Sequence, residues 1–325
     1  MKSLLFTRYG PPDGLRLAEI DPPTPAPDEM LIRVRAASIN SWDWELLHGL
    51  PFANRAVFGL LRPKVIQALG CDVAGVVAAV GSRITRFTEG DAVFGDLSTG
   101  KRWGGFAEYT CAKEHEVILK PEGLSFEQAA ALPQAGLLAL QGLRDVGQLQ
   151  PGMRVLINGA GGGTGTFALQ LARHLLAGYV AGVDRGDKLD LIRGLGGDLA
   201  LDYEREEFSN RGERYDLILD CQCHRSLEQC ARALAPGGRY LVVGGSMKRI
   251  FQALALGGWR YRREDKKIGL LIHKANRGLQ ELADLVSEGV VSPMIDRVFP
   301  LERAVEGLRY FGEGGVRGKI IVSIK

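Results

Sequence analysis

The sequence predicts an α/β protein in which a doubly wound parallel sheet is combined with a second, mostly antiparallel β domain. Three observations carry this prediction. An apolar run at residues 155–157 meets a glycine cluster, which opens a segment of helical apolar spacing at 166–176. Further β-like and helical segments alternate after it, which is typical of a parallel sheet. Residues 1–120 instead hold short β-like runs between turns rich in Pro and Gly.

The N-terminal region is interpreted as a compact β domain. Its spacing of short strands and turns favours a mostly antiparallel arrangement, with expected strands at 30–36, 73–80, 92–94 and 106–110. The segment Pro121-Glu-Gly123 marks a boundary. Ser125 is a suitable N-cap for the helix that follows, because Gln128 stands three residues on, as a capping box requires.

The central region begins with a strand, a tight glycine turn and a helix. Glycines let the chain turn sharply and let a pyrophosphate approach, and the free N–H groups and dipole of the helix N-terminus favour its charge. We therefore expect a dinucleotide to contact Ala160, Gly162, Gly163, Thr164 and Gly165. Taken alone, the motif also fits a glycine turn that binds nothing.

The segments that follow support the dinucleotide interpretation. A second expected strand, 179–183, ends at Asp184, about where this fold places an acidic residue on the adenosine ribose. Because ligands lie at the carboxyl ends of parallel strands, Gly244 is a further expected contact. The remaining expected elements are helices at 188–195 and 227–235 and strands at 198–201, 215–219 and 239–243.

The C-terminal segment can close the first domain. It is expected to form a helix at 277–288, an extended stretch at 291–299, a helix at 301–311 and a last strand at 319–324. The domain holding the parallel sheet is then an insertion. We expect one domain from residues 1–120 with 270–325 and the other from 121–269.

Composition limits the class of protein. The chain has 325 residues, 46% hydrophobic and 24% charged, as expected for two globular domains. A net charge of +3 is too mild to indicate nucleic acid, and the basic segment 260–267 is interpreted as a solvated face. We found no apolar run long enough to span a bilayer and no secretory signal, so we expect a cytoplasmic protein without a membrane partner.

The cysteines indicate a reducing compartment. Five cysteines form an odd, sparse set, which predicts free thiols. The segment Cys221-Gln-Cys223-His224 lacks a second ligand pair at zinc-finger spacing, so no metal is expected there.

Seven motifs stand in a specific order and spacing along the chain: Asn40-Ser-Trp-Asp43, residues 70–81, Gly90-Asp-Ala-Val-Phe94, Gly105-Phe-Ala-Glu-Tyr109, Ala129-Ala-Ala-Leu-Pro133, Ala160-Gly-Gly-Gly-Thr-Gly165 and Arg317-Gly-Lys319. In these motifs the chain resembles the medium-chain dehydrogenase/reductase superfamily and its zinc-independent quinone oxidoreductase-like branch. The resemblance implies a GroES-like domain, a Rossmann domain with a cleft between them, and a homodimer. It also implies NAD(P)H-dependent transfer of hydride to a quinone or an α,β-unsaturated carbonyl, a small-molecule substrate.

The positions that match the catalytic zinc ligands of the zinc-dependent relatives hold Asn40, Cys71 and Gln134. One thiol with two amides is a poor zinc site, and the four-cysteine structural lobe of those relatives is missing, so no zinc is expected. Without a Lewis acid, oxidation of an alcohol is disfavoured, and reduction of an activated acceptor remains.

Two residues are predicted to be catalytic, Asn40 and Tyr109. The Asn40 amide can hydrogen-bond the oxygen of a developing enolate or hydroquinone, although a turn residue bonded to its own backbone is the alternative. Tyr109 and His48 are candidate proton donors, and solvent is the alternative. Asp43 is expected to be structural.

The residues give conflicting indications of whether the cofactor is NAD or NADP. Asp184 would accept a hydrogen bond from a ribose 2′-OH and repel a 2′-phosphate, which favours NAD. Arg185, Lys188 and Tyr203 lie where NADPH-using relatives contact that phosphate, so our lean toward NAD(H) is slight. The resemblance adds Lys319 and Leu138 as cofactor contacts, although Leu138 stands where Thr is common.

Two other functions compete with the reductase. Leu138, the missing proton donor and the basic segment would also suit a catalytically weak NAD(P)-binding protein that acts as a sensor or scaffold. A zinc alcohol dehydrogenase using Cys71 is a lesser alternative.

Overall fold

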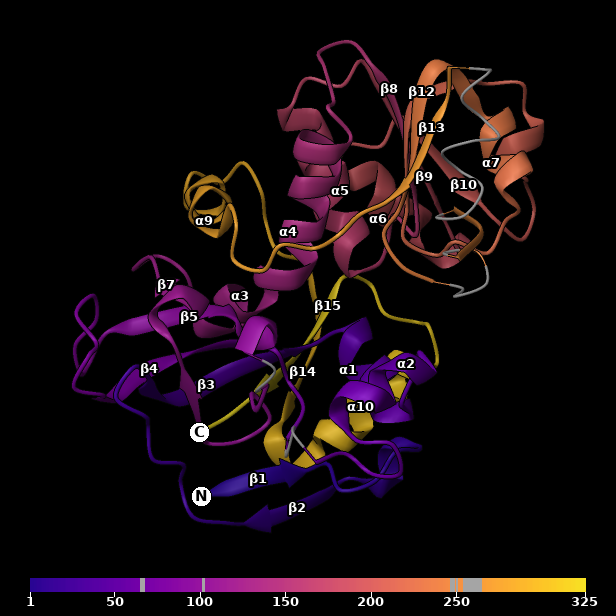
Figure 1. The fold of residues 1–325 in the computed structure, drawn as a ribbon. Helices are drawn as coiled ribbons and strands as arrows, with labels where there is room; N and C mark the ends of the chain where they lie inside the picture. Colours follow the sequence, from indigo (N-terminus) through magenta and orange to yellow (C-terminus); the bar gives the residue numbers. More distant parts are fainter. Residues whose placement is uncertain (65–67, 101–102, 246–248, 250, 254–264) are drawn as a thin grey trace. The chain divides into compact units, whose positions relative to one another are not determined.

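The computed structural model describes residues 1–64, 68–100, 103–245, 249, 251–253 and 265–325 (Figure 1). The chain forms two compact units. The first unit comprises Met1–Gln134, Lys274–Ser287 and Ile295–Lys325, and the second comprises Ala135–His273 and Glu288–Met294. Among the described residues, none of the helices combines the length and apolar character that crossing a bilayer requires.

The first unit is built on a mixed, mostly antiparallel sheet in the order β14-β15-β3-β4-β5-β7, with β6 paired to β3. Only β14 and β15 run parallel. β15 returns from the C-terminus to pair with β3, and Figure 1 shows this yellow strand beside the N-terminal half of the sheet. The strands are β3 (Met30–Ile39), β4 (Asp72–Val80), β5 (Ala92–Asp96), β6 (Tyr109–Ala112), β7 (Ile118–Leu119), β14 (Ile295–Pro300) and β15 (Lys319–Ser323).

Alternation along β3 explains the core of this unit. Met30, Ile32 and Val34 are buried at every second position, as one face of a strand requires, and they join one apolar cluster. A separate hairpin pairs β1 (Lys2–Leu5) with β2 (Arg16–Glu19). The helices of this unit are η1 (Pro12–Gly14), α1 (Ser41–His48), α2 (Phe52–Phe58), η2 (Leu97–Gly100), η3 (Glu114–Glu116), α3 (Phe126–Ala131), α9 (Leu279–Ser287), η8 (Leu301–Arg303) and α10 (Ala304–Gly312).

The helix α3 begins as its sequence predicts. The Ser125 hydroxyl accepts a hydrogen bond from the Gln128 N–H at 3.1 Å, and the Gln128 side chain accepts from the Ser125 N–H at 3.0 Å. The expected strand at 106–110 lies further on, at Tyr109–Ala112. The cause is that the Gly105 and Phe106 N–H groups bind the carbonyls of Gly70 and Leu69 instead of joining the sheet.

The second unit is built on a six-stranded parallel sheet in the order β10-β9-β8-β11-β12-β13. This is the strand order of the dinucleotide-binding fold, so the predicted doubly wound parallel sheet is confirmed. The strands are β8 (Arg154–Asn158), β9 (Tyr179–Asp184), β10 (Leu199–Asp202), β11 (Tyr215–Asp220), β12 (Leu234–Val242) and β13 (Lys267–Leu270).

Within the described part of the second unit, η4 (Gln141–Val146) precedes β8, and the other helices lie between successive strands. These are α5 (Gly163–His174), η5 (Gly186–Lys188), α6 (Leu189–Gly194), η6 (Phe208–Asn210) and α7 (Leu227–Arg232), while α4 (Pro133–Leu140) begins in the first unit. Most of the basic segment 260–267 lies outside the described residues.

Candidate active site

Asn40 lies at the end of β3, where the chain turns into α1, and its side chain is almost fully buried. Its backbone N–H donates to Asp43 at 2.8 Å. Its amide nitrogen donates to Asp72 Oδ2 at 2.9 Å, and its amide oxygen accepts from Lys319 Nζ. Asn40 is therefore the centre of a buried polar cluster that joins β3, β4 and β15.

The cluster holds more acid than base. Asp43, Asp72 and Asp96 are fully buried, and Lys319 is 3% exposed. Asp72 also accepts from the Ser38 hydroxyl at 3.1 Å and from the Gln134 N–H at 3.2 Å.

Burial shifts the protonation of the cluster. It raises the pKa of Asp43 to about 7, and burial together with neighbouring Asp96 raises that of Asp72 to about 6. Burial also lowers the pKa of Lys319 and raises that of the Cys71 thiol. The Lys319 ammonium is the positive charge that these carboxyl groups face.

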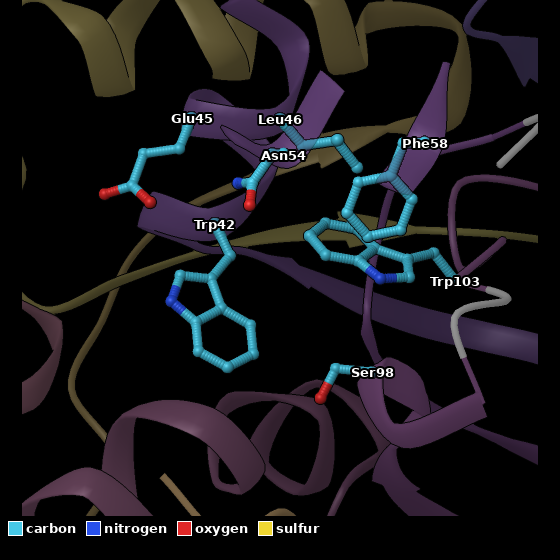
Figure 2. Close-up of a pocket in the computed structure, with 7 residues that line it drawn as sticks. All are labelled: Trp42, Glu45, Leu46, Asn54, Phe58, Ser98 and Trp103. Carbon is cyan, nitrogen blue, oxygen red and sulfur yellow. The ribbon is translucent and has the colours of Figure 1, made fainter. Parts of the chain in front are cut away.

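A cavity of about 320 Å³ opens within the first unit (Figure 2). Its volume falls within the range of small-ligand pockets. The walls are mainly apolar, and burial raises the pKa of the one carboxyl group among the described lining residues, Glu45, to about 7. The lining residues come from α1, α2 and the chain around η2: Trp42, Glu45, Leu46, Asn54, Phe58, Ser98 and Trp103.

The two residues predicted to be catalytic are not brought together. Tyr109 pairs with Arg33 on β3, whereas Asn40 follows the other end of that strand, about 20 Å away at the usual rise per residue. Tyr109 lines another cavity, of about 350 Å³, together with Ser3 and Thr110. His48, the other candidate donor, has its Nδ1 atom 2.8 Å from the Trp44 carbonyl oxygen.

In the second unit, the glycine loop lies between β8 and α5. The N–H groups of Gly159 and Ala160 both bind the Val183 carbonyl, at 2.9 and 3.1 Å, which turns the chain under β9. A Cβ atom on Gly165 would lie 2.2 Å from the Gly159 carbonyl oxygen, so only glycine fits there. The first N–H groups of α5 have no carbonyl one turn earlier in the helix and face the loop.

Asp184 is fixed beside this loop. One carboxylate oxygen accepts from the Gly161 N–H at 2.8 Å, and the other accepts from the Arg185 N–H at 2.9 Å. Lys188 Nζ lies 3.3 Å from the carboxylate, and both side chains are nearly buried. Arg185 pairs with Asp187 at 2.6 Å, and Tyr203 is 48% exposed.

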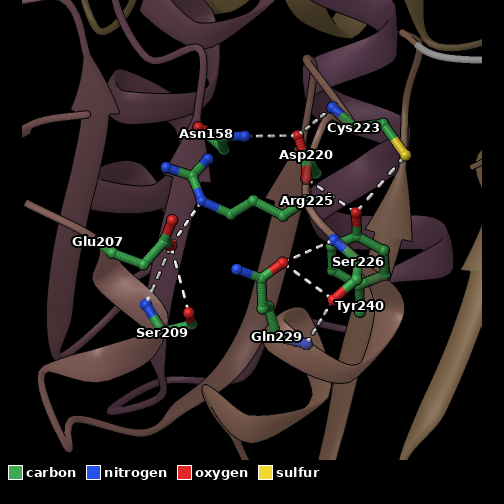
Figure 3. A network of polar contacts seen from close by, with 9 residues as sticks. All are labelled: Asn158, Glu207, Ser209, Asp220, Cys223, Arg225, Ser226, Gln229 and Tyr240. Carbon is green, nitrogen blue, oxygen red and sulfur yellow. Dashed lines mark hydrogen bonds and ion pairs between the residues drawn. The ribbon is translucent and has the colours of Figure 1, made fainter. Parts of the chain in front are cut away.

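Asp220 joins the ends of three neighbouring strands (Figure 3). Its carboxylate accepts from the Asn158 amide at 2.7 Å and from the Tyr240 hydroxyl at 2.8 Å. The Cys223 N–H also donates to it, at 2.7 Å. These bonds hold β8, β11 and β12 together at the point where the strand order reverses, which is where such sheets bind ligands.

The other predicted cofactor residues are placed as follows. Leu138 is 7% exposed in α4, Gly244 follows β12, and Lys319 binds Asn40 in the first unit. Sequence reasoning missed Asp72, Asp96 and Glu45 as site residues. An acid inside the apolar run of β4 is a signal that would have indicated Asp72, whereas Glu45 carries no comparable signal.

Comparisons with known proteins agree with this architecture. An alcohol dehydrogenase GroES-like domain matches residues 26–122, and a zinc-binding dehydrogenase domain matches residues 195–322. The 2-methylene-furan-3-one reductase of Solanum lycopersicum is 32% identical over 99% of this chain and 79% of its own length. A chloroplastic quinone-oxidoreductase homolog of Spinacia oleracea is 31% identical over 99% of this chain and 98% of its own.

A solved structure, the quinone oxidoreductase of Coxiella burnetii, matches with a TM-score of 0.88 and 30% identity, covering 100% of this chain and 99% of that one. These relatives extend over both units, as the motifs do. The chain therefore belongs to the medium-chain dehydrogenase/reductase superfamily, in its quinone oxidoreductase-like branch, and is an oxidoreductase.

Proposed function

We propose that the protein uses a reduced nicotinamide dinucleotide, preferably NADH, to reduce a quinone or an α,β-unsaturated carbonyl without zinc. The observation that carries this proposal is the polar cluster around Asn40, where Lys319 supplies a buried positive charge. The names of similar proteins support the acceptor class, because they include an NADPH-dependent alkenal/one oxidoreductase of Arabidopsis thaliana.

The donor set of the cluster suits zinc poorly. Cys71 Sγ and carboxylate oxygens of Asp72 and Asp96 lie within 4.8 Å of one another. Zinc needs deprotonated ligands, yet burial raises the pKa of the Cys71 thiol, and Asp72 is occupied by Ser38, Asn40 and Gln134. The proposed reaction therefore involves no metal ion.

The glycine loop suits a dinucleotide. A Cβ atom on Gly162 would meet only the Gly159 carbonyl oxygen, at 3.4 Å, so the backbone there is open to a ligand. The N–H groups of Gly163 and Thr164 would hold the pyrophosphate, and Asp184 would bind the adenosine ribose. Bound there, the reduced nicotinamide supplies a hydride.

The acceptor supplies its own electrophilic activation. A quinone or enone delocalises the arriving charge onto oxygen, so the protein has to orient the acceptor, exclude water and provide a proton. The apolar walls of the cavity near Trp42 and Trp103 suit a flat, conjugated acceptor. Asn40 is not among the described residues that line this cavity; we propose it as the polar group for the acceptor oxygen because it caps α1, the helix that carries the lining residue Trp42.

The preference for NADH follows from the fixed position of Asp184. Because two backbone N–H groups hold its carboxylate, it cannot turn away from a 2′-phosphate, and desolvating that pair of negative charges is costly. Arg185 is already paired with Asp187, so it is less available to a phosphate.

The test uses metal-free protein and follows oxidation of NADH and, separately, NADPH with a panel of quinones and enones. We expect acceptor-dependent oxidation, faster with NADH and unchanged by chelator. Tight dinucleotide binding without oxidation would instead favour the sensor or scaffold. Stoichiometric zinc whose removal abolishes activity would favour the alcohol dehydrogenase.

We also propose that the protein is a cytoplasmic homodimer. β13 is an edge strand of the parallel sheet, and an edge strand can pair with a second copy. Light scattering on the purified chain tests the dimer, and a monomer at micromolar concentration would contradict it.

A further inference from the structure

Glu45 supplies the one carboxyl group among the described residues that line the cavity in the first unit, and no role has been assigned to it. Trp42, Glu45 and Leu46 lie three and four residues apart on α1, so they share one face of the helix. Leu46 is buried in the core, which directs this face into the unit. Figure 2 shows Glu45 among the side chains that line the cavity, with Phe58 and Trp103 in its apolar wall.

The Glu45 carboxyl has no bonded partner among the residues that the structure describes. The other acid of the same helix differs, because Asp43 accepts hydrogen bonds from the Gly70 N–H at 2.7 Å and from the Asn40 N–H at 2.8 Å. Glu45 is therefore the acid of α1 that is left to contact a ligand in the cavity.

The described charged groups near the cavity have partners other than Glu45. On α2, Arg55 donates to the carbonyls of Gly49 and His48 and lies 4.6 Å from the centre of the Tyr9 ring. Near η2, Asp96 accepts from the Ser98 N–H at 2.8 Å. Lys101 and Arg102, before Trp103, lie outside the described residues.

Burial among these apolar walls raises the pKa of Glu45 to about 7. A carboxyl group with this raised pKa keeps its proton closer to neutral pH than an ordinary carboxyl group does. A group in that state can give a proton and recover it quickly, which is the property required of a general acid.

We propose that Glu45 is the proton donor of the reaction, giving its carboxyl proton to the acceptor held in the cavity beside Trp42 and Trp103. This inference rests on the proposed reductase function. It supplies the group that neither Tyr109 nor His48 offers in this cavity, since neither residue lines it.

The step balances. Hydride from the reduced dinucleotide brings two electrons to the acceptor, which becomes an enolate or a hydroquinone anion. The O–H bond of Glu45 then breaks, and its proton forms a C–H bond at the enolate α-carbon or an O–H bond on the hydroquinone. The electron pair stays on the Glu45 carboxylate, which takes a proton from water, and the dinucleotide leaves oxidised.

The first test measures binding without dinucleotide. Titration with 2-cyclohexen-1-one quenches the fluorescence of Trp42 and Trp103 if the enone enters this cavity. We expect the affinity of the wild type to weaken severalfold between about pH 6 and about pH 8, as the Glu45 proton is lost. In Glu45→Gln the amide donates at every pH, so the affinity should stay constant. An unchanged pH dependence in the variant would overturn the proposal.

The second test measures turnover. We expect wild-type kcat/KM to fall above about pH 7 along one ionisation, and Glu45→Gln to lose that ionisation and about 10²-fold in kcat. Glu45→Asp should keep the ionisation and part of the rate. Glu89→Gln, at an exposed turn of the same unit, is the matched control and should behave as wild type.

Different results would contradict the reductase function and the role of Glu45. A wild-type protein that oxidises neither dinucleotide with any acceptor would overturn the reductase function and with it the role of Glu45. An active wild type whose Glu45→Gln variant keeps the same rate and pH profile, and the same melting temperature, would overturn the role of Glu45 alone.

Discussion

Asp184 carries a formal charge that can be removed with little change of shape. Replacing Asp184 with Asn keeps one oxygen for the Gly161 N–H and removes the repulsion of a 2′-phosphate. We expect the ratio of kcat/KM for NADH to that for NADPH to fall at least about fivefold, since charges at contact distance interact by at least about 1 kcal/mol. Steady-state kinetics with both dinucleotides measure this ratio.

The control for Asp184→Asn is Asp190→Asn, whose side chain is 98% exposed and pairs with Arg193 on α6. It removes the same charge a few residues away and should leave the ratio unchanged. A ratio that does not move in Asp184→Asn would contradict the proposed basis of the NADH preference.

Lys319 faces the buried carboxyl groups of the first unit, so its replacement should lower the free energy of unfolding. Lys319→Met leaves Asp72 and Asn40 without their cation. Losing a hydrogen bond from a charged donor to a buried partner costs about 1.5–3 kcal/mol in the free energy of unfolding. Chemical denaturation followed by tryptophan fluorescence measures the loss.

Two further variants make the Lys319 prediction specific. Adding Asp72→Asn to Lys319→Met should recover part of the loss, because it removes a carboxyl group that has no counter-charge. Lys2→Met breaks an exposed pair with Glu302 and should change stability little. A Lys319→Met protein as stable as wild type would show that the cluster needs no cation.

At the scale of elements, the start of α5 depends on one glycine. A Cβ atom on Gly165 would lie 2.2 Å from the Gly159 carbonyl oxygen and 2.5 Å from Ala160 Cα, so Gly165→Ala must push the helix away from the loop. We expect the dissociation constant for NADH to rise at least about tenfold, as a shift of about 1.4 kcal/mol produces. Calorimetric titration measures it.

Gly194→Ala is the matched control for Gly165→Ala. Gly194 ends α6, and a Cβ atom there meets nothing within 4 Å. The substitution should leave NADH binding unchanged and stabilise the helix slightly. Equal binding by both variants would contradict the assigned geometry of the loop.

The elements show why the fold was predictable and part of the site was not. β8, the glycine turn and α5 were predicted from local signals, namely apolar periodicity and glycine positions within one stretch. The strand at Tyr109–Ala112 was misplaced because its start depends on Leu69 and Gly70, which are distant in sequence. The contact between Lys319 and Asn40 is equally non-local. Glu45 resembles a solvent-facing helix residue until the cavity around it is known.

The whole molecule should lose stability as the pH rises toward neutral. Folding raises the pKa of Asp43 to about 7 and that of Asp72 to about 6, above the ordinary carboxyl pKa of 3.8. At pH values between the unfolded and the folded pKa of these carboxyl groups, the folded protein therefore binds more protons than the unfolded chain. This contribution to stability is complete below the unfolded pKa and is lost as the pH rises through the folded pKa.

Lowering the pH from about 7 to about 5 should therefore add on the order of 2 kcal/mol from Asp43 alone. Denaturation of wild type and Asp43→Asn at both pH values measures this term, because the variant cannot titrate there. We expect the variant to gain less than wild type on acidification. Equal gains would mean that Asp43 is already ionised at about pH 5.

The pairing of β15 with β3 also affects how the chain matures on the ribosome. Because Lys319–Ser323 completes a sheet that begins with residues made long before, the first unit stays unfinished until these residues have been made. The inserted unit takes all its strands from a continuous stretch and can fold earlier. Until Lys319 emerges, the nascent chain holds Asp72 without its counter-charge, so the parallel-sheet unit can be folded while the sheet of the first unit is still open to chaperones.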